Sequence, residues 1–493
     1  MILSHALITC FSGCVAALES LTIVPQFARS NAAAPLPNNL IGFSIKSDRW
    51  NDWTGRLSDP NKYTYTLLDN LKQKTGVASP IRVGGDTEDR LSWSEDVDGV
   101  NNIFPAVPDV ITATKQLFPE ASHGKIGGDW FYLSRNLPEG TAIIWGVNFA
   151  ANSVTEALTQ DESLQSVTLE SIEIGNEVDY WGGLYRPKNW TMSAYVDQYN
   201  DFVEEINKSI GPDGLRYQIG AFSGVWDSTQ IGKTDLFQSQ LGKVAQSFSD
   251  HHYNNVADFT TRPESEWPSL RAQLITKSNI RNNLTAFGPK AKFFHEHKLH
   301  YYLGETNSMF GHGMPGVSNS AAASLWAIDY VLQAATLGVD TVYLHSGVGY
   351  NYSAFQPIDH LGKNITDYSP SATRHITPLY MGVMVLSDII GKHTSTWINE
   401  LQTGNDHLAA YLIFEDSRLA RVVLINSEAW EGDELTPRPG ITVYISGIDP
   451  SEAKLKRLSP PNLGTTSGIL WGSQSWESDS GDVMASSAVV IFL

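Results

Sequence analysis

The chain of 493 residues contains only two cysteines, Cys10 and Cys14, close to its N-terminus. Both fall within an apolar stretch, MILSHALITCFSGCVAALES, which resembles a secretory signal peptide and has small residues near Ala16 and Ala17. The stretch lacks the early Lys or Arg that such peptides usually carry. We expect residues 1–17 to be removed. The mature chain would then have no disulfide, no cysteine metal site and no thiol chemistry.

Long apolar runs and positive charge are also scarce. Outside the N-terminal stretch, no run is long and apolar enough to cross a bilayer. The chain has 34 Lys and Arg residues against 53 Asp and Glu residues, so its formal net charge is −19. Such a surface repels nucleic acid and anionic membranes, and neither is an expected partner. It also disfavours a long sulfated polyanion as substrate, because a cleft for such a chain would need a basic rim. We expect a secreted, extracellular monomer.

Five Asn-X-Ser/Thr sequons fit a secreted glycoprotein. The candidate glycosylation sites are Asn189, Asn207, Asn283, Asn351 and Asn364. Chance alone would give several sequons in a chain of this length, so they support secretion only together with the signal-like start.

What the sequence does contain is a regular alternation of strand-like and helix-length segments over residues 40–377. Such alternation is typical of an α/β protein, and eight strands with intervening helices are the number in a (β/α)8 barrel. The predicted strands are 40–47, 80–85, 142–150, 169–177, 217–224, 247–253, 300–307 and 341–347. The predicted helices are 61–75, 190–209, 229–244, 267–280 and 319–337.

The sequence pattern changes after residue 377. Segments such as AAYLIFEDS, RVVLINS and GITVYISG read as short strands joined by turn residues, which predicts an all-β sandwich over 378–493. The stretch LTIVPQF at 21–27 is also strand-like. We therefore expect residues 18–39 to add an N-terminal strand to this second domain.

Two glutamates, Glu177 and Glu305, come at or near the ends of strand-like runs, in IEIGNEVDYW and YLGETNSMFGHG. In a (β/α)8 barrel, catalytic side chains come from the C-terminal ends of the strands. These glutamates belong to the fourth and seventh predicted strands, so both should reach one mouth. Paired carboxylates are what glycoside hydrolysis requires. An isolated strand-end glutamate is more often a helix cap or a solvated loop residue, but the joint placement favours catalysis.

Several motifs together resemble the β-glucuronidase/heparanase family of retaining glycosidases, glycoside hydrolase family 79, within the large (β/α)8-barrel clan. The GNE motif on the fourth strand is shared by the whole clan. The joint occurrence of GETNS and GVGYNY is more specific, and the likeness covers nearly the whole chain, including the β-domain. The motifs that carry it are IRVGGDTEDR, IGNEVDYW, DHHYN, GETNSMFGHG and HSGVGYNYSAFQP.

This resemblance implies that Glu177 is the general acid/base and Glu305 the nucleophile. The first role requires Glu177 to hold a proton at rest, which the negative charge of Glu305 favours. Asn176 is implied to hydrogen-bond the sugar 2-hydroxyl, and Asp48 to accept from another sugar hydroxyl. A turn or cap role is equally open for Asp48.

Other positions follow from strand geometry and from the same family. His251 and Tyr253 alternate onto one face of the sixth strand, where both could reach the nucleophile, whereas His252 would face away. The charged residues Asp86, Glu88 and Asp89 could compete as acids, but their density after GG suggests a solvated loop or a barrel-mouth network.

Recognition of a glucuronate carboxylate is implied for Gly349 and Tyr350, because the family uses backbone N–H groups and tyrosine hydroxyls for this purpose. The segment Phe310, Gly311 and His312 departs from the usual Tyr and Gly-Gly. Phe310 cannot donate the tyrosine hydrogen bond, although a cationic His312 would suit a carboxylate. A modified or uncharged sugar is therefore a live alternative.

The sequence thus predicts a secreted, retaining exo-β-glucuronidase that removes terminal glucuronic or 4-O-methylglucuronic acid from carbohydrate substrates. It needs no cofactor or metal. A neutral β-glycosidase such as a β-glucosidase is the second reading, and an endo-acting heparanase-like enzyme is the third. A non-catalytic glycan-binding barrel is disfavoured, because it would be expected to have lost one of the two glutamates.

Overall fold

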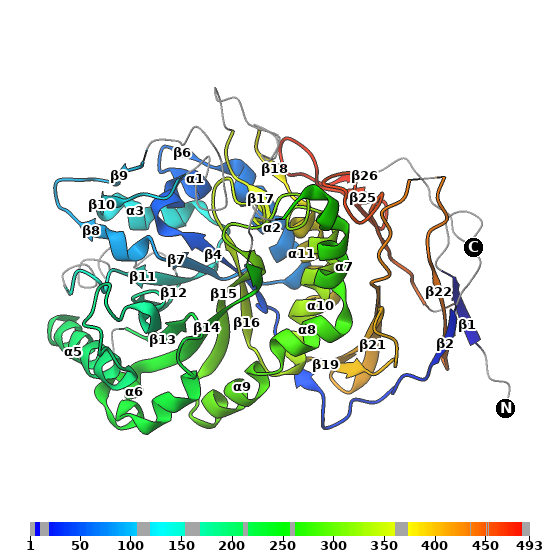
Figure 1. The fold of residues 1–493 in the computed structure, drawn as a ribbon, viewed down its shortest axis with the longest axis horizontal. Coiled ribbons are helices and arrows are strands. Elements are labelled where there is room, and N and C mark those ends of the chain that lie inside the picture. The colour runs from blue at the N-terminus through cyan, green and yellow to red at the C-terminus, as the bar shows by residue number, and fades with distance from the viewer. Residues whose placement is uncertain are drawn as a thin grey trace.

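The computed structural model consists of a barrel with a β-domain packed beside it (Figure 1). It describes residues 5–9, 19–105, 119–152, 168–210, 215–256, 262–359, 373–433, 435–449, 451 and 453–485. None of the helices within these ranges is long and apolar enough to span a bilayer.

The barrel is a closed ring of eight parallel strands, and each predicted strand is confirmed. Parallel pairing of the last strand with the first closes the ring. The ring runs through β4 (Ile41–Lys46), β7 (Ile81–Gly84), β11 (Ala142–Val147), β12 (Thr168–Ile174), β13 (Tyr217–Phe222), β14 (Ala245–Val256), β15 (His300–Phe310) and β16 (Thr341–Ser346). These strands are buried on both faces, as expected for a sheet covered by helices.

Most predicted helices are confirmed, and two differ. Thr276 has an extended backbone and divides the predicted helix at 267–280 into two. The predicted helix at 229–244 is instead a series of short turns, because Asp227 and Ser239 each cap a new start. The longer helices are α2 (Lys62–Thr75), α5 (Met192–Ile210), α7 (Trp267–Ile275), α8 (Lys277–Leu284), α9 (Phe287–Glu296), α10 (Ala321–Thr336) and α11 (Pro378–Ile390).

Helix α11 begins at the predicted domain boundary and packs against α10 and α2 on the barrel. The β-strands of the second domain therefore begin after it, at β19 (Thr396–Leu401). The helix is buried almost all round, so its sequence lacks the polar face by which an exposed helix is recognised.

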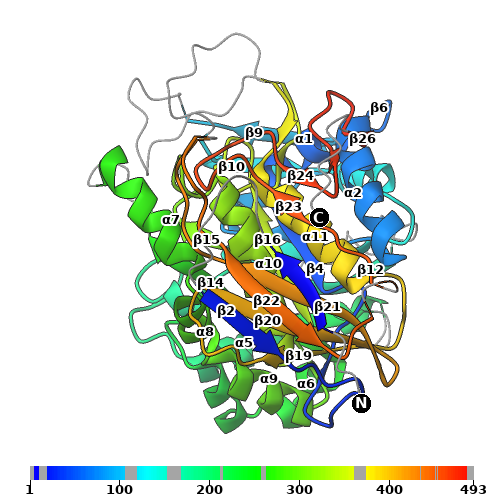
Figure 2. The ribbon, with the colours of Figure 1, turned by 90° about the vertical axis from the view of Figure 1, so that its right-hand side faces the viewer.

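The β-domain contains two facing sheets, which Figure 2 shows one in front of the other with the barrel behind them. One sheet has the order β21-β20-β19-β3 and the other β1-β22-β2. Apolar residues from both, including Ile23, Leu408 and Val443, form a core between them. The strands not yet introduced are β1 (His5–Thr9), β2 (Glu19–Ile23), β3 (Ala34–Pro35), β20 (Leu408–Glu415), β21 (Arg418–Asn426) and β22 (Ile441–Ser446).

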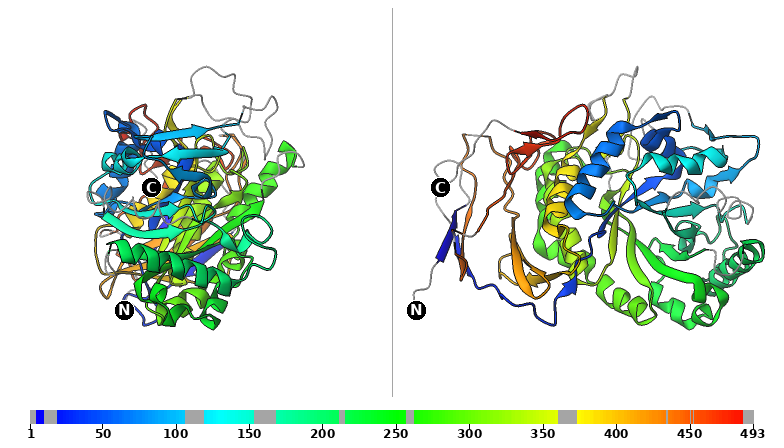
Figure 3. Two further views of the ribbon diagram at one scale, coloured as in Figure 1. Left: turned by 90° about the vertical axis from the view of Figure 1, so that its left-hand side faces the viewer. Right: turned by 180° about the vertical axis from the view of Figure 1, so that it is seen from behind.

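The N-terminal segment joins this domain, as predicted from LTIVPQF, because β2 pairs with β22 and β3 pairs with β19. Strand β1, in the segment predicted to be a signal peptide, pairs with the other edge of β22. The view from behind in Figure 3 follows the N-terminal chain from the β-domain to the barrel.

A buried ionic cluster ties the barrel to the β-domain. The ammonium of Lys277 lies 2.7 Å from Asp329, 2.6 Å from Gln333 and 2.5 Å from the hydroxyl of Tyr411. It also lies 3.1 Å from Glu400. These residues come from α8, α10, β19 and β20, so one ammonium holds two helices of the barrel and two strands of the β-domain.

We expect Lys277→Ala to lower the free energy of unfolding by about 3–5 kcal/mol, because it leaves the carboxylate of Asp329 buried without its cation. Tyr411→Phe removes one hydroxyl and should cost only about 1 kcal/mol. Thermal and urea unfolding of both variants measure this. Equal, small losses in the two variants would show that the cluster does not couple the domains.

Candidate active site

The end of β12 turns sharply and presents Glu177 at the mouth of the barrel. Gly175 has a φ of 83°, and Glu177 itself lies in the left-handed region at φ 49° and ψ 43°. A glutamate rarely adopts this conformation, and such strain is concentrated at functional sites. The backbone N–H of Glu177 donates to the carbonyl of Ala221, 2.9 Å away, which holds the turn against β13.

The two predicted catalytic carboxylates meet at this mouth. Glu305 lies within β15, and the pairing of β14 with β15 places His251 directly beside it. One carboxylate oxygen of Glu177 and one of Glu305 lie within 4.8 Å of each other, and His251 Nδ1 is within the same distance of both. Retaining glycosidases hold their two carboxyl groups about 5–5.5 Å apart, whereas inverting enzymes leave about 6.5–9.5 Å for a water molecule. The spacing fits the retaining geometry.

Glu305 is held by donors on both carboxylate oxygens. Arg82 Nη1 donates to Oε2 at 2.9 Å, and the hydroxyl of Tyr253 donates to Oε1 at 2.7 Å. His345 Nδ1 lies 3.5 Å from Oε2. Burial by itself would raise the pKa of Glu305, but the surrounding cations outweigh it and hold this pKa well below its ordinary value. Glu305 is therefore ionised and fixed in place, as a nucleophile must be.

Glu177 is the more open of the pair, with a side chain 27% exposed against 9% for Glu305. Its Oε1 lies 3.0 Å from Nδ1 of the buried His251. Burial lowers the pKa of His251, yet its hydrogen bond to Glu177 and the charge of Glu305 outweigh this and leave the pKa raised. The exposed carboxyl beside a titratable ring can exchange a proton with both solvent and substrate.

Arg82, which the sequence analysis did not single out, joins most of this site. It is fully buried inside the barrel and donates Nε to Glu173 at 2.7 Å, Nη1 to Ser44 at 3.0 Å and Nη2 to Asn176 at 2.8 Å. An arginine within the buried run PIRVGG was the available signal, because an unpaired buried guanidinium is too costly to occur.

The carboxamide of Asn176 is placed by this arginine, just beyond the end of β12 and next to Glu177 in the chain. Its backbone N–H donates to Asp89 at 3.0 Å, and its carbonyl accepts from the indole of Trp181 at 3.0 Å. Three separate contacts thus orient Asn176, which supports its implied role at the sugar.

The acidic cluster after GG is a buried barrel-mouth network, and the alternative of a solvated loop is wrong for two of its members. Asp89 accepts from the backbone N–H groups of Phe149 and Ala150, and burial raises its pKa to about 7. Glu88 is buried in space left by Gly146, where any Cβ would collide with its carboxylate. Burial and the charges of neighbouring carboxylates raise the pKa of Glu88 well above its ordinary value.

Asp48 is buried and makes structural contacts. Its Oδ2 accepts from the backbone N–H of Ala121 at 2.7 Å, while its Oδ1 is buried with no hydrogen-bond partner. Burial raises its pKa to about 6. The contact of Oδ2 fits the turn role that the sequence left open. Oδ1 remains as an acceptor without a hydrogen-bond partner.

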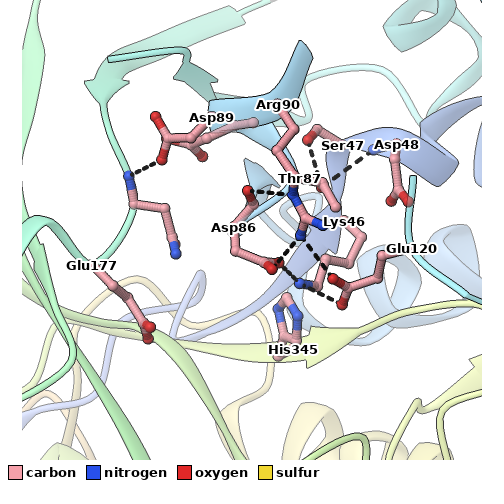
Figure 4. A network of polar contacts seen from close by, with 12 residues as sticks. Lys46, Ser47, Asp48, Asp86, Thr87, Asp89, Arg90, Glu120, Glu177 and His345 are labelled. Carbon is pink, nitrogen blue, oxygen red and sulfur yellow. Dashed lines mark hydrogen bonds and ion pairs between the residues drawn. The ribbon is translucent and has the colours of Figure 1, made fainter. Parts of the chain in front are cut away.

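Glu120 gathers the polar groups on one side of the mouth, which Figure 4 shows around Lys46. Its carboxylate lies 2.8 Å from Lys46 and 2.9 Å from Arg90. It also accepts from the hydroxyl of Tyr350 at 2.7 Å and lies 3.2 Å from His312. Burial would raise the pKa of Glu120, but the nearby cations, Lys46 first among them, lower it well below its ordinary value.

This network changes the predicted recognition of a sugar carboxylate. The role implied for Gly349 is corrected. Its backbone N–H already donates to the side chain of Gln356 at 2.8 Å and is not available to a substrate. The hydroxyl of Tyr350 is engaged by Glu120. Sequence reasoning missed Glu120 because it lies in no strand and belongs to none of the quoted motifs.

Phe310 and His312 lie at the same mouth and face different surroundings. The Phe310 ring is 52% exposed and meets the edge of Tyr253 at 5.5 Å. His312, after the tight turn at Gly311, stacks on Tyr350 with ring centroids 3.8 Å apart. His252, as predicted, faces away from the site and packs beside Phe287.

The glycosylation candidates differ in exposure. Asn189 is exposed, and Asn207 and Asn283 are half-buried. Asn351 is buried, and its side chain donates to the carbonyl of Gly313 at 3.2 Å, so no glycan fits there. Asn364 lies outside the described residues.

Metal-binding potential in the described part of the chain is confined to Glu177, His251 and Glu305. Two of these are the predicted catalytic carboxylates, and His251 hydrogen-bonds one of them.

Comparison with known proteins agrees with this geometry. The glycosyl hydrolase family 79 C-terminal β-domain matches residues 410–490. A β-glucuronidase of Aspergillus niger is 27% identical over 475 residues, covering 90% of this chain and 84% of that protein. A β-glucuronidase of Neurospora crassa is 26% identical over 514 residues, covering 93% and 88%.

Solved structures give the same fold. A 4-O-α-L-rhamnosyl-β-D-glucuronidase from Fusarium oxysporum has a TM-score of 0.76 at 21% identity, with 95% of this chain and 94% of that chain covered. A family 51 α-L-arabinofuranosidase from Bifidobacterium longum has a TM-score of 0.59 at 13% identity, with 93% and 95% covered. The resemblance drawn from the motifs is confirmed: the chain is a glycoside hydrolase whose C-terminal β-domain matches that of glycoside hydrolase family 79 and whose relatives over most of its length are β-glucuronidases.

Proposed function

We propose that the protein is a retaining exo-β-glucuronidase that removes a terminal β-linked glucuronic or 4-O-methylglucuronic acid from a glycan or glycoside. The observation that supports retention is the spacing of the two carboxylates, within 4.8 Å, at the mouth of the barrel. The β-glucuronidase activity of two relatives that match most of the chain supports the choice of sugar.

The reaction follows from the different surroundings of the two glutamates. In the first step a carboxylate oxygen of Glu305 bonds to the anomeric carbon, the glycosidic bond breaks, and Glu177 gives its proton to the leaving oxygen. In the second step ionised Glu177 takes a proton from water. The water oxygen bonds to the anomeric carbon, and the bond to Glu305 breaks, so both side chains return to their starting states.

Tyr253 and Arg82 hold the nucleophile throughout this cycle. Each donates to a different oxygen of Glu305, so the carboxylate cannot rotate away from the anomeric carbon. Asn176, fixed by Arg82, places its carboxamide next to Glu177, where a hydrogen bond to the 2-hydroxyl would strengthen as the ring gains positive charge.

A neutral sugar is the second candidate, and a specific observation favours it. The hydroxyl of Tyr350 donates to Glu120, and the cations Lys46 and Arg90 contact the same carboxylate. Phe310 has no hydroxyl to add. A glucuronate carboxylate would therefore share or displace the contacts of Glu120, whereas the hydroxymethyl group of glucose would bring no second negative charge.

Secretion is part of the proposal and rests on the signal-like segment at 1–17 and the exposed sequon at Asn189. We propose that the enzyme acts outside the cell as a monomer. The N-terminal sequence and the mass of the protein in its culture medium test this: a retained Met1, or a dimer, would contradict it.

We expect Glu305→Gln to reduce kcat on a chromogenic β-glucuronide by at least about 10⁴-fold, because no covalent intermediate can form. Thermal unfolding and retention of the substrate by the variant are the controls for folding. A near-normal rate in Glu305→Gln would show that another group is the nucleophile.

Glu177→Ala should respond differently. With a good leaving group the first step needs little acid, so the second step becomes limiting, and azide should restore turnover as a small nucleophile that needs no general base. The product would be the β-glycosyl azide, identified by NMR. An α-linked azide, or no response to azide in a folded variant, would contradict a retaining role for Glu177.

Phe310→Tyr tests the sugar. If this position sets specificity, the added hydroxyl should raise the preference for glucuronide over glucoside by about tenfold, a hydrogen bond to a charged group being worth ~1.5–3 kcal/mol. The measurement is kcat/KM on chromogenic β-glucuronide, β-glucoside, β-xyloside and β-galactoside. Phe27→Tyr is the matched control, because Phe27 lies in the N-terminal segment and is 50% exposed. An unchanged preference in Phe310→Tyr would remove this residue from specificity.

A further inference from the structure

Four large apolar side chains are exposed beside the acid/base. Tyr180 is 61% exposed, Leu184 73%, Tyr185 47% and Val225 57%. A single exposed leucine or valine is ordinary on a protein surface, but a group of apolar side chains on adjoining segments marks a binding site. We call these four residues the leaving-group rim.

The rim is tied directly to Glu177. Tyr180 closes the short η4 helix (Val178–Tyr180), and its backbone N–H donates to the carbonyl of Glu177 at 2.9 Å. The backbone N–H of Leu184 donates to the carbonyl of Trp181 at 2.9 Å. The rings of Tyr185 and Trp181 pack edge to face, with centroids 5.1 Å apart. Three members of the rim therefore follow Glu177 within one compact loop.

Val225 comes from the loop after β13 and is joined to the same place through a buried carboxylate. Asp179, next to Tyr180 in η4, accepts from the backbone N–H of Val225 at 2.8 Å and from those of Ser223 and Gly224 at 3.0 and 3.1 Å. One side chain thus fixes both loops, so the exposed Val225 lies on a segment that is tied to η4.

Two tryptophans, Trp181 buried and Trp190 half-buried, hold this loop in place. The indole of Trp181 donates to the carbonyl of Asn176 at 3.0 Å, and that of Trp190 donates to Val178 at 2.9 Å. Arg186 lies over both rings and donates to the carbonyl of Phe149 at 2.8 Å. A ligand on the rim therefore meets side chains already in position, and little ordering entropy is lost on binding.

We propose that the leaving-group rim binds the aglycone and selects one with an apolar, hydrocarbon face. This inference rests on the proposed role of Glu177 as general acid. A general acid must lie within hydrogen-bond reach of the leaving oxygen. The group attached to that oxygen therefore extends over the residues around Glu177, and those residues are the rim.

The chemistry of the rim favours a hydrocarbon over a second sugar. A sugar in this position needs several hydrogen-bonding partners, whereas Leu184 and Val225 offer none and the hydroxyls of Tyr180 and Tyr185 are the polar groups that the four rim side chains supply. The carboxylate of Asp179 is already satisfied by backbone donors and a serine hydroxyl. Apolar area removed from water stabilises a complex in proportion to its size, so a larger hydrocarbon aglycone gains more.

The test uses methyl and cyclohexylmethyl β-glucuronides, whose alcohols are of similar acidity, so that leaving-group chemistry does not differ. We expect kcat/KM for the cyclohexylmethyl compound to exceed that for the methyl compound by about tenfold or more, from the extra buried hydrocarbon. Leu184→Ser and Val225→Ser should each lower this ratio by about fivefold. The ratio of the two kcat/KM values, and not the rate on either compound alone, is the readout for both variants.

Val77→Ser is the matched control, because Val77 is 39% exposed and precedes β7 at the opposite end of the barrel. It should leave the ratio unchanged. A wild-type ratio near one, or a ratio that neither rim variant lowers, would overturn the proposal.

The test separates the rim from the choice of sugar. If both glucuronides are inert and a chromogenic β-glucoside is cleaved, the proposed sugar is wrong. The methyl and cyclohexylmethyl β-glucosides then replace the glucuronides, and the same two variants decide the role of the rim.

Discussion

The buried guanidinium of Arg82 is the interaction on which the site depends. It stands on β7 inside the barrel and reaches Ser44 on β4, Glu173 on β12, Asn176 just beyond β12 and Glu305 on β15. A guanidinium carries its N–H donors in one fixed plane. The positions of the nucleophile and of the residue beside the acid/base are therefore fixed relative to each other through a single side chain.

The same cation allows carboxylates to exist inside the barrel. Glu88, Glu173 and Glu305 all lie near Arg82, and burial, together with the charges of neighbouring carboxylates, raises the pKa of Glu88. Taking a carboxylate out of water is costly unless it is paired, and losing one partner of a buried pair costs about 3–5 kcal/mol. The ionised state of a nearly buried nucleophile is thus maintained by the fold itself, through Arg82.

The strands, and the meeting of Glu177 and Glu305 at one mouth, could be predicted from the sequence because both follow local rules. Period, length and turn residues locate strands, and a barrel puts strand ends at one mouth. The contacts of Arg82 with Glu173 and Glu305 span 91 and 223 residues, so no local pattern reveals them. Glu120 could not be predicted either, because it lies in no strand and belongs to none of the motifs. Gly349 shows the converse limit, because a motif gives the position of an N–H group but not whether a neighbour such as Gln356 has already used it.

The mouth combines two kinds of surface. Lys46, Arg90 and Glu120 form a charged network, and the leaving-group rim beside Glu177 exposes mainly hydrocarbon. These two surfaces suit the two parts of the substrate. The sugar ring gains positive charge in the transition state, and the leaving group departs as a neutral alcohol. A surface of net charge −19 repels a polyanionic glycan more strongly than a compound with one carboxylate. Charge and rim together therefore favour a single uronic acid on an apolar aglycone.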